Sequence, residues 1–113
     1  MIKNEKISLN YLLNNNRFKC LNLEEKFILM NIYNNQSRNY WGLDYFSKRL
    51  NRTRQTISKY MENLHKCGFI NRIKLPEKRY YQVEISKYML DCCGVVDSEE
   101  IVNLFNQVYH KER

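Results

Sequence analysis

Polar side chains recur at helical spacing between residues 54 and 66. They are Arg54, Gln55, Ser58, Lys59 and Glu62. The first four can hydrogen-bond to base edges or phosphates. At 3.6 residues per turn they share one face of a helix, opposite an apolar stripe at i, i+3, i+4 and i+7 formed by Ile57, Tyr60, Met61 and Leu64. Arginine can form a bidentate pair with guanine, and glutamine can form one with adenine. The polar face is therefore suited to reading bases in a nucleic acid.

The excess positive charge of the chain is concentrated around this helix. The whole chain has 19 Lys and Arg against 12 Asp and Glu, a net charge of +7. Residues 42–80 contain ten basic and three acidic residues, whereas the nine basic and nine acidic residues elsewhere cancel. Each phosphate that such a surface neutralises releases condensed counterions and strengthens binding. The distribution predicts a polyanionic partner.

Length and composition restrict the class of protein. A chain of 113 residues is sufficient for one domain with a core, and it leaves little room for a separate module. The first residues lack the apolar segment of a signal peptide, and no run approaches the roughly 18 apolar residues of a membrane span. We therefore expect a single cytoplasmic domain that does not enter a membrane.

The cysteines leave one alternative function open. Cys20, Cys67, Cys92 and Cys93 have no CxxC spacing, so we expect mostly reduced, buried thiols and no bound metal. His65 with Cys67, and the adjacent Cys92 and Cys93, still offer imidazole and thiolate ligands. A metal- or thiol-responsive transcriptional sensor is the alternative interpretation.

Catalytic chemistry finds little support in the sequence. His65 is expected near a helix end and His110 in the tail. There is no glycine-rich phosphate loop, and no nucleophile has a base at a recognisable spacing. We expect a protein without enzymatic activity and without a cofactor.

Local signals predict the helices that position the polar face. A first short helix is expected over residues 5–15. Asn22 with Glu25 forms a capping-box pattern for a helix that continues to about Tyr33. A short amphipathic helix from Leu43 should end near Asn51, which tolerates the left-handed conformation of a tight turn.

The next helix, from about Arg54 to Lys66, should be capped by Thr53 and closed by Gly68. Residues 69–85 then predict a hairpin of two strands around a turn at 75–79, with Phe69 and Ile73 alternating with polar neighbours on the first strand and Tyr81, Val83 and Ile85 on the second. Lys74, Lys78 and Arg79 give this hairpin a basic tip.

The C-terminal residues predict a surface for self-association. Another helix should begin at Ser86, and a last one, capped by Asp97 and Glu100, carries an apolar stripe of Ile101, Leu104, Phe105 and Val108. The stripe is longer than the preceding elements need to complete their own core. Packing on the same domain is one explanation, and a symmetric dimer is the one we favour. A dimer would place two helices in successive major grooves, so the target should be a palindrome or a run of repeats.

The segment FSKRLNRTRQTISKYMENLHKCGFI resembles the winged helix-turn-helix family. The matching positions are Phe46, Ser47 and Leu50 of the first helix, Thr53 and Ile57 of the second, and Leu64, Gly68, Phe69 and Ile70 leading into the wing. The resemblance covers roughly residues 22–85. Similar segments occur in MarR-like repressors, in plasmid and phage replication proteins, and in the small TubR adaptors of tubulin-type plasmid partition. Asn51 replaces a frequent Gly and Ser47 a usual Ala, which bears only on the geometry of the turn.

The resemblance implies an α+β, mostly α-helical winged helix-turn-helix domain with a two-stranded wing and flanking N- and C-terminal helices. The helix-turn-helix should span about 43–67, the wing about 69–85 and the dimerisation helix about 97–110. The implied function is sequence-specific binding of double-stranded DNA by a homodimer. Its role would be that of a transcriptional repressor, or of a centromere- or origin-binding adaptor with a protein partner in partition or replication.

Individual roles follow from the chemistry of the side chains. We expect Arg54, Gln55, Ser58 and Lys59 to read bases. Arg52, Thr53 and Thr56 should fix the register on the phosphate backbone. Lys74, Lys78 and Arg79 of the wing should add affinity more than specificity.

Overall fold

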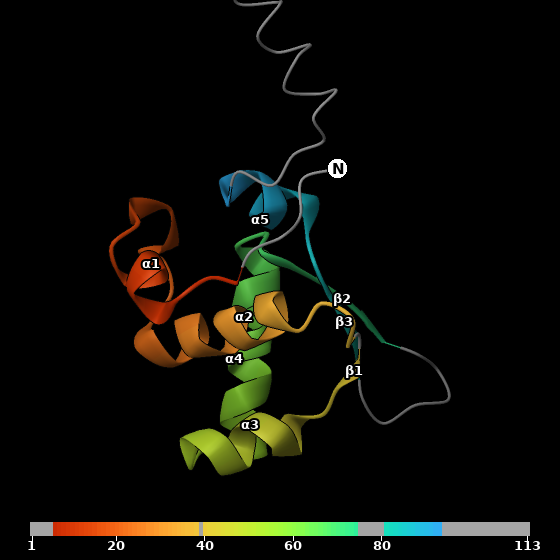
Figure 1. Ribbon diagram of the computed structural model, residues 1–113. Coiled ribbons are helices and arrows are strands. Elements are labelled where there is room, and N and C mark those ends of the chain that lie inside the picture. Colours follow the sequence, from red (N-terminus) through yellow and green to blue (C-terminus); the bar gives the residue numbers. More distant parts are fainter. Residues whose placement is uncertain (1–5, 39, 75–80, 94–113) are drawn as a thin grey trace, which may run out of the picture.

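A computed structural model describes residues 6–38, 40–74 and 81–93 of the chain (Figure 1). In chain order, the helical N-terminal part comprises α1 (Leu9–Leu13), the 3-10 turn η1 (Asn16–Phe18) and α2 (Leu23–Asn34). The remaining elements are β1 (Tyr40–Trp41), α3 (Leu43–Leu50), α4 (Arg54–Lys66), β2 (Ile70–Lys74), β3 (Tyr81–Ile85) and α5 (Lys87–Cys92). The predicted α+β, mostly helical architecture is confirmed. The predicted last helix, 97–110, lies outside the described residues.

Helix α2 begins with the predicted capping box. Asn22 Oδ1 accepts from the Glu25 amide at 2.7 Å, and Glu25 Oε1 accepts from the Asn22 amide at 2.8 Å. The second carboxylate oxygen of Glu25, which is buried, accepts from Asn63 Nδ2 of α4 at 2.9 Å. One carboxylate therefore both starts α2 and joins it to α4.

The turn between α3 and α4 forms as predicted. Asn51 has φ 53°, in the left-handed region. The Arg52 amide donates to the Ser47 carbonyl at 3.1 Å, and the Ser47 hydroxyl donates to the Arg52 carbonyl. The serine that replaces the usual alanine thus adds a hydrogen bond across the turn. Thr53 then caps α4, because its Oγ1 accepts from the Thr56 amide at 3.2 Å.

The end of α4 sets the start of the hairpin. Gly68 has φ 86°, and its amide donates to the His65 carbonyl at 3.0 Å. The Phe69 amide donates to the Leu64 carbonyl at 3.1 Å, which completes a Schellman motif. The predicted role of Gly68 as a helix-terminating residue is confirmed.

The sheet differs from the predicted hairpin in two respects. It has three antiparallel strands in the order β1-β3-β2, because Tyr40 and Trp41 pair with the outer side of β3. Ile73 was expected to alternate inward with Phe69, but 48% of it is exposed. Strand β2 begins at Ile70, which pairs with Ile85, so the alternation places Ile70 inward and Ile73 on the solvent side.

The core lies where α2, α4 and the sheet meet. Its fully buried side chains include Ile28 and Ile32 of α2, Ile57 and Leu64 of α4, and Val83 of β3. In Figure 1, α4 runs along the molecule, α2 and α3 cross it, and the sheet lies to one side. The first and last described helices also contact each other, because the Tyr11 hydroxyl of α1 donates to the Cys92 carbonyl of α5 at 3.1 Å. None of the described helices is long and apolar enough to span a membrane.

Candidate nucleic-acid interface

The exposed face of α4 presents Gln55 and Lys59 side by side, one helical turn apart. Both are exposed and come from the first half of the helix. Glu62 and Lys66 continue the same face and form an ion pair, with Lys66 Nζ 3.3 Å from Glu62 Oε1. The N-terminal half of this face therefore offers an amide and an ammonium group to a ligand, whereas the C-terminal half is electrically balanced.

Arg54 occupies the first position of α4 and leans toward α3. Its Nε lies 3.1 Å from Oδ1 of Asp44, and the two side chains are 65% and 64% exposed. An ion pair with this degree of solvent exposure contributes little to stability, about 0 to 1 kcal/mol. The guanidinium is therefore oriented by Asp44 but can leave it for another acceptor.

Ser58 lies on a different flank of α4. It is half-buried, and Arg72 Nη2 of β2 donates to its hydroxyl at 3.4 Å. The structure places Ser58 against the sheet and not on the outward stripe that helical spacing predicts. Successive helix positions are 100° apart, so helical spacing alone does not show whether Ser58 faces solvent or a neighbouring element. The position of β2 decides this.

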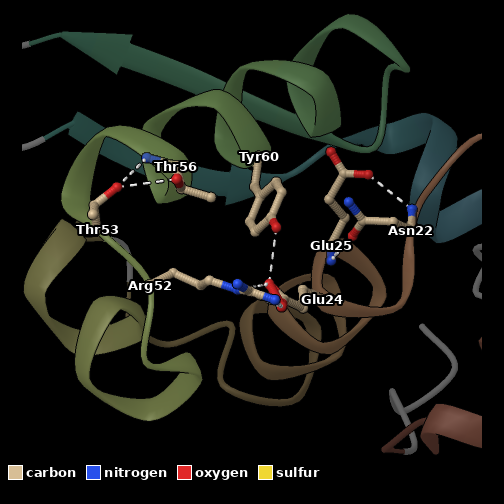
Figure 2. A network of polar contacts seen from close by, with 7 residues as sticks. All are labelled: Asn22, Glu24, Glu25, Arg52, Thr53, Thr56 and Tyr60. Carbon is tan, nitrogen blue, oxygen red and sulfur yellow. Dashed lines mark hydrogen bonds and ion pairs between the residues drawn. The ribbon is translucent and has the colours of Figure 1, made fainter.

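Arg52 stands in the turn before α4 and is engaged by α2 (Figure 2). Its Nε lies 2.7 Å from Oε1 and 3.1 Å from Oε2 of Glu24, and its Nη2 lies 2.7 Å from Oε1. The Tyr60 hydroxyl of α4 donates to Glu24 Oε2 at 2.8 Å. Hydrogen bonds from Arg52 and then Tyr60 lower the pKa of Glu24, and the bond to Glu24 raises the pKa of Tyr60.

The two threonines assigned to the backbone register lie within the helix cap. Thr53 Oγ1 and Thr56 Oγ1 are 3.0 Å apart, in addition to the capping bond to the Thr56 amide. Thr53 is exposed and Thr56 half-buried. They fix the first turn of α4, whose N-terminus favours an anion.

The remaining predicted site residues fall at or beyond the limits of the described chain. Lys74 is the last residue of β2 and is exposed. Lys78 and Arg79 of the wing, and the four residues assigned to dimerisation, lie outside the described residues.

The acidic partners of Arg52 and Arg54 have no signal in the local sequence pattern. Glu24 lies 28 residues before Arg52, and Asp44 belongs to a different helix from Arg54. No spacing rule links residues so far apart. Their acidic character near a basic surface was the only available signal.

The cysteines differ in exposure, and Cys67 lies near Cys20. Cys92 is buried, Cys67 and Cys93 are half-buried, and Cys20 is exposed. The cysteines are therefore less buried than the sequence predicts. Burial, and secondarily the neighbouring Cys20, raises the pKa of Cys67 to about 11. His65 Nδ1 lies 3.2 Å from the Ile70 carbonyl, which can only accept. In the part of the chain that the structure describes, no three His, Cys, Asp or Glu residues are grouped to hold a metal.

Known proteins resemble the chain in structure. No protein-family model and no curated protein matches it in sequence. A MepR variant from a multidrug-resistant S. aureus clinical isolate superposes with a TM-score of 0.54 at 19% identity, over 82% of this chain and 65% of that one. The match therefore spans slightly less than two thirds of that regulator's length.

Two further solved structures have the same arrangement. Streptococcus pneumoniae FabT, in complex with DNA, gives a TM-score of 0.54 at 18% identity, over 88% of this chain and 79% of that one. The adhesin competence repressor AdcR from Streptococcus pyogenes gives 0.52 at 20% identity, over 91% and 74%. At these identities the likeness concerns the fold, and it agrees with the capped α3–α4 pair and the hairpin that follows it. The described chain has the winged helix-turn-helix fold.

Proposed function

We propose that the protein binds double-stranded DNA sequence-specifically and regulates transcription by occupying its site, without catalysis. The observation that carries this proposal is the first half of α4. Gln55 and Lys59 point into solvent from a helix whose N-terminus is fixed by Thr53, and Arg54 stands beside them. Helices of this kind enter the major groove with their N-terminal residues against base edges.

Three side chains are proposed as base readers. Arg54 would exchange its exposed Asp44 partner for guanine, and Gln55 would pair with adenine. Lys59 would reach a base edge or a phosphate one turn further along. Ser58, which contacts Arg72, is a weaker candidate than its residue type suggests.

Similar folds support DNA as the partner. FabT was solved in complex with DNA, and AdcR is a repressor. The +7 charge of the chain, all of it within residues 42–80, is complementary to a phosphate backbone. Lys74, with Lys78 and Arg79 in the wing, would add backbone contacts that carry no sequence information.

The proposed assembly is a homodimer. The apolar stripe of Ile101, Leu104, Phe105 and Val108 supports it from sequence periodicity. Two recognition helices related by a two-fold axis would read a palindrome, in which half-sites are separated by about one helical turn of DNA. A partition or replication adaptor would instead coat a long array of repeats and bind a protein partner of that machinery.

Selection from a random duplex library tests the proposal. The wild-type protein should enrich a defined motif, and Gln55→Ala should enrich a motif degenerate at one position of each half-site. Gln36→Ala, which removes an exposed amide from the segment after α2, is the matched control and should select the wild-type motif. Failure of the wild-type protein to enrich any motif would contradict the proposal. A single palindrome would favour a repressor, and a repeat array would favour the adaptor.

A further inference from the structure

Two arginines outside α4 are held against aromatic rings at the junction of β1 and α3. The guanidinium carbon of Arg38 lies 4.3 Å from the ring centre of Trp41 and 4.7 Å from that of Tyr45. The guanidinium carbon of Arg49 lies 4.4 Å from the Tyr45 ring centre. We call Arg38, Trp41, Tyr45 and Arg49 the arginine–aromatic cluster. Tyr45 is its centre, because both guanidinium groups contact this ring.

The rings of the cluster are fixed by the core. Trp41 is 2% exposed and stacks on Phe46, with ring centres 5.4 Å apart and planes at 17°. Tyr45 meets the edges of both rings, at 5.5 Å from Trp41 and 5.0 Å from Phe46. Trp41 Nε1 donates to the Arg38 carbonyl at 3.0 Å, and Arg38 Nε donates to the Tyr40 carbonyl at 3.1 Å. The arginines are thereby placed before any ligand arrives.

The charges of the cluster are not balanced within the described chain. Arg52 and Arg54 form ion pairs with carboxylates, whereas among the described residues Arg38 and Arg49 form none. Their two distances to the Tyr45 ring centre limit the separation of the two guanidinium carbons to about 9 Å. This is comparable with the Debye length of about 8 Å at physiological ionic strength, so the two charges repel each other. An anion bound beside them would relieve that repulsion.

Stacking leaves the hydrogen-bonding capacity of a guanidinium available. Contact with the rings leaves the N–H donors in the plane of each guanidinium, and of these only Arg38 Nε is engaged within the described residues, by the Tyr40 carbonyl. Arg38 and Arg49 are both exposed. Planar donors of this kind match the oxygens of a phosphate, often in bidentate geometry.

We propose that the arginine–aromatic cluster is a second DNA-binding surface, which holds backbone phosphates beside the groove entered by α4. This inference rests on the proposed function. It is favoured because α3 contributes to both sites: Tyr45 follows Asp44 in this helix, and Asp44 holds Arg54 of α4 at 3.1 Å. Strand β1, which contributes Trp41, also pairs with strand β3 of the wing. The cluster supplies affinity and register, because bonds to phosphates carry no base information.

The salt dependence of binding tests this surface. In the double variant Arg38→Gln/Arg49→Gln, the slope of log association constant against log salt concentration should decrease by about 0.9 for each phosphate that is no longer neutralised. The ratio of affinities for the selected motif and a point-mutated motif should stay at the wild-type value. The double variant Arg17→Gln/Lys19→Gln, which removes two exposed positive charges at η1 and its C-cap, is the charge-matched control and should keep the wild-type slope.

Variants of Tyr45 test whether its ring must hold the two arginines in place, while the charges of both arginines are kept. Tyr45→Leu keeps both arginines but removes their shared ring, so affinity should fall for every duplex, whereas Tyr45→Phe should restore it. A double variant with wild-type slope and affinity would overturn the inference while leaving the proposed function intact, provided that Arg54→Ala still weakens binding. A wild-type protein that binds no duplex would overturn both. A change of motif preference in the double variant would overturn the assignment to phosphates.

Discussion

The Arg52 guanidinium contacts both carboxylate oxygens of Glu24, with Nε 2.7 Å from Oε1 and 3.1 Å from Oε2. Tyr60 donates to the same carboxylate at 2.8 Å. Three elements therefore meet at one side chain: the start of α2, the turn before α4 and the middle of α4 (Figure 2). This junction sets the orientation of α4 relative to α2, and the adjacent capping-box residue Glu25 adds a second link through Asn63.

We predict that Glu24→Gln reduces stability most near neutral pH. The folded-state pKa of Glu24 is lowered, chiefly by its hydrogen bonds from Arg52 and then Tyr60. The contribution of the carboxylate is therefore complete above its unfolded pKa and is lost as pH falls through the lower folded value. Thermal melts of wild type and Glu24→Gln should differ at pH 7 and converge on acidification. Asp91→Asn, an exposed control, should follow the wild-type curve. A constant difference at all pH values would contradict the assignment.

Arg54→Ala should weaken binding to the selected motif by on the order of 1 to 3 kcal/mol and relax the preference at one base position. Asp44→Asn should strengthen binding to unrelated sequences, because it removes a negative charge that lies 3.1 Å from Arg54 and near the proposed DNA interface. Fluorescence anisotropy with selected and scrambled duplexes measures both effects. Equal losses on the two duplexes for Arg54→Ala would show that this arginine contacts phosphates rather than bases.

Gly68→Ala should destabilise the fold by about 1 to 2 kcal/mol, the cost of a left-handed conformation for a residue with a Cβ atom. Sterics add little, since the nearest atom to an added Cβ is Tyr88 Cδ2 at 3.6 Å. Gly42→Ala is the matched control. Gly42, the N-cap of α3, has φ −77° and no atom within 4 Å of an added Cβ. The change should be close to neutral, because alanine is a poorer N-cap but restricts the unfolded chain. Urea denaturation compares the two, and equal effects would exclude the positive φ as the cause.

Binding should be insensitive to thiol chemistry at Cys67. Its pKa, raised by burial to about 11, keeps the side chain protonated and poorly nucleophilic near neutral pH. Affinity for the selected duplex should be the same before and after mild oxidation or addition of zinc, and in a variant with all four cysteines replaced by serine. A change on oxidation that the serine variant lacks would instead support the thiol-sensor alternative.

Local signals were sufficient to predict the helix-turn-helix. Thr53, Asn51 and Gly68 each act on the backbone within a few residues, and all three occupy the expected conformations. Strand β1 was missed because two residues cannot show a period. Ile73 was placed on the wrong face because its orientation depends on where β2 begins, and a shift of one residue reverses every side chain.

The candidate site was less predictable than the fold. The stripe of α4 follows from helical period, which correctly separates the exposed Gln55 and Lys59 from the buried Ile57. The partners of Arg52 and Arg54 depend on contacts between different helices, and the contact of Arg38 with Tyr45 depends on the path of the chain through β1 into α3. Such interactions have no signature in a single sequence.

The most direct test of the central claim is the ratio of affinities for a selected duplex and a scrambled duplex of the same composition, measured at one physiological salt concentration. If the exposed face of α4 reads bases, the selected duplex should bind at least about 10³-fold more tightly. The Gln55→Ala variant should reduce that ratio, and the Gln36→Ala control should not. Equal affinity of the wild-type protein for both duplexes would contradict the account.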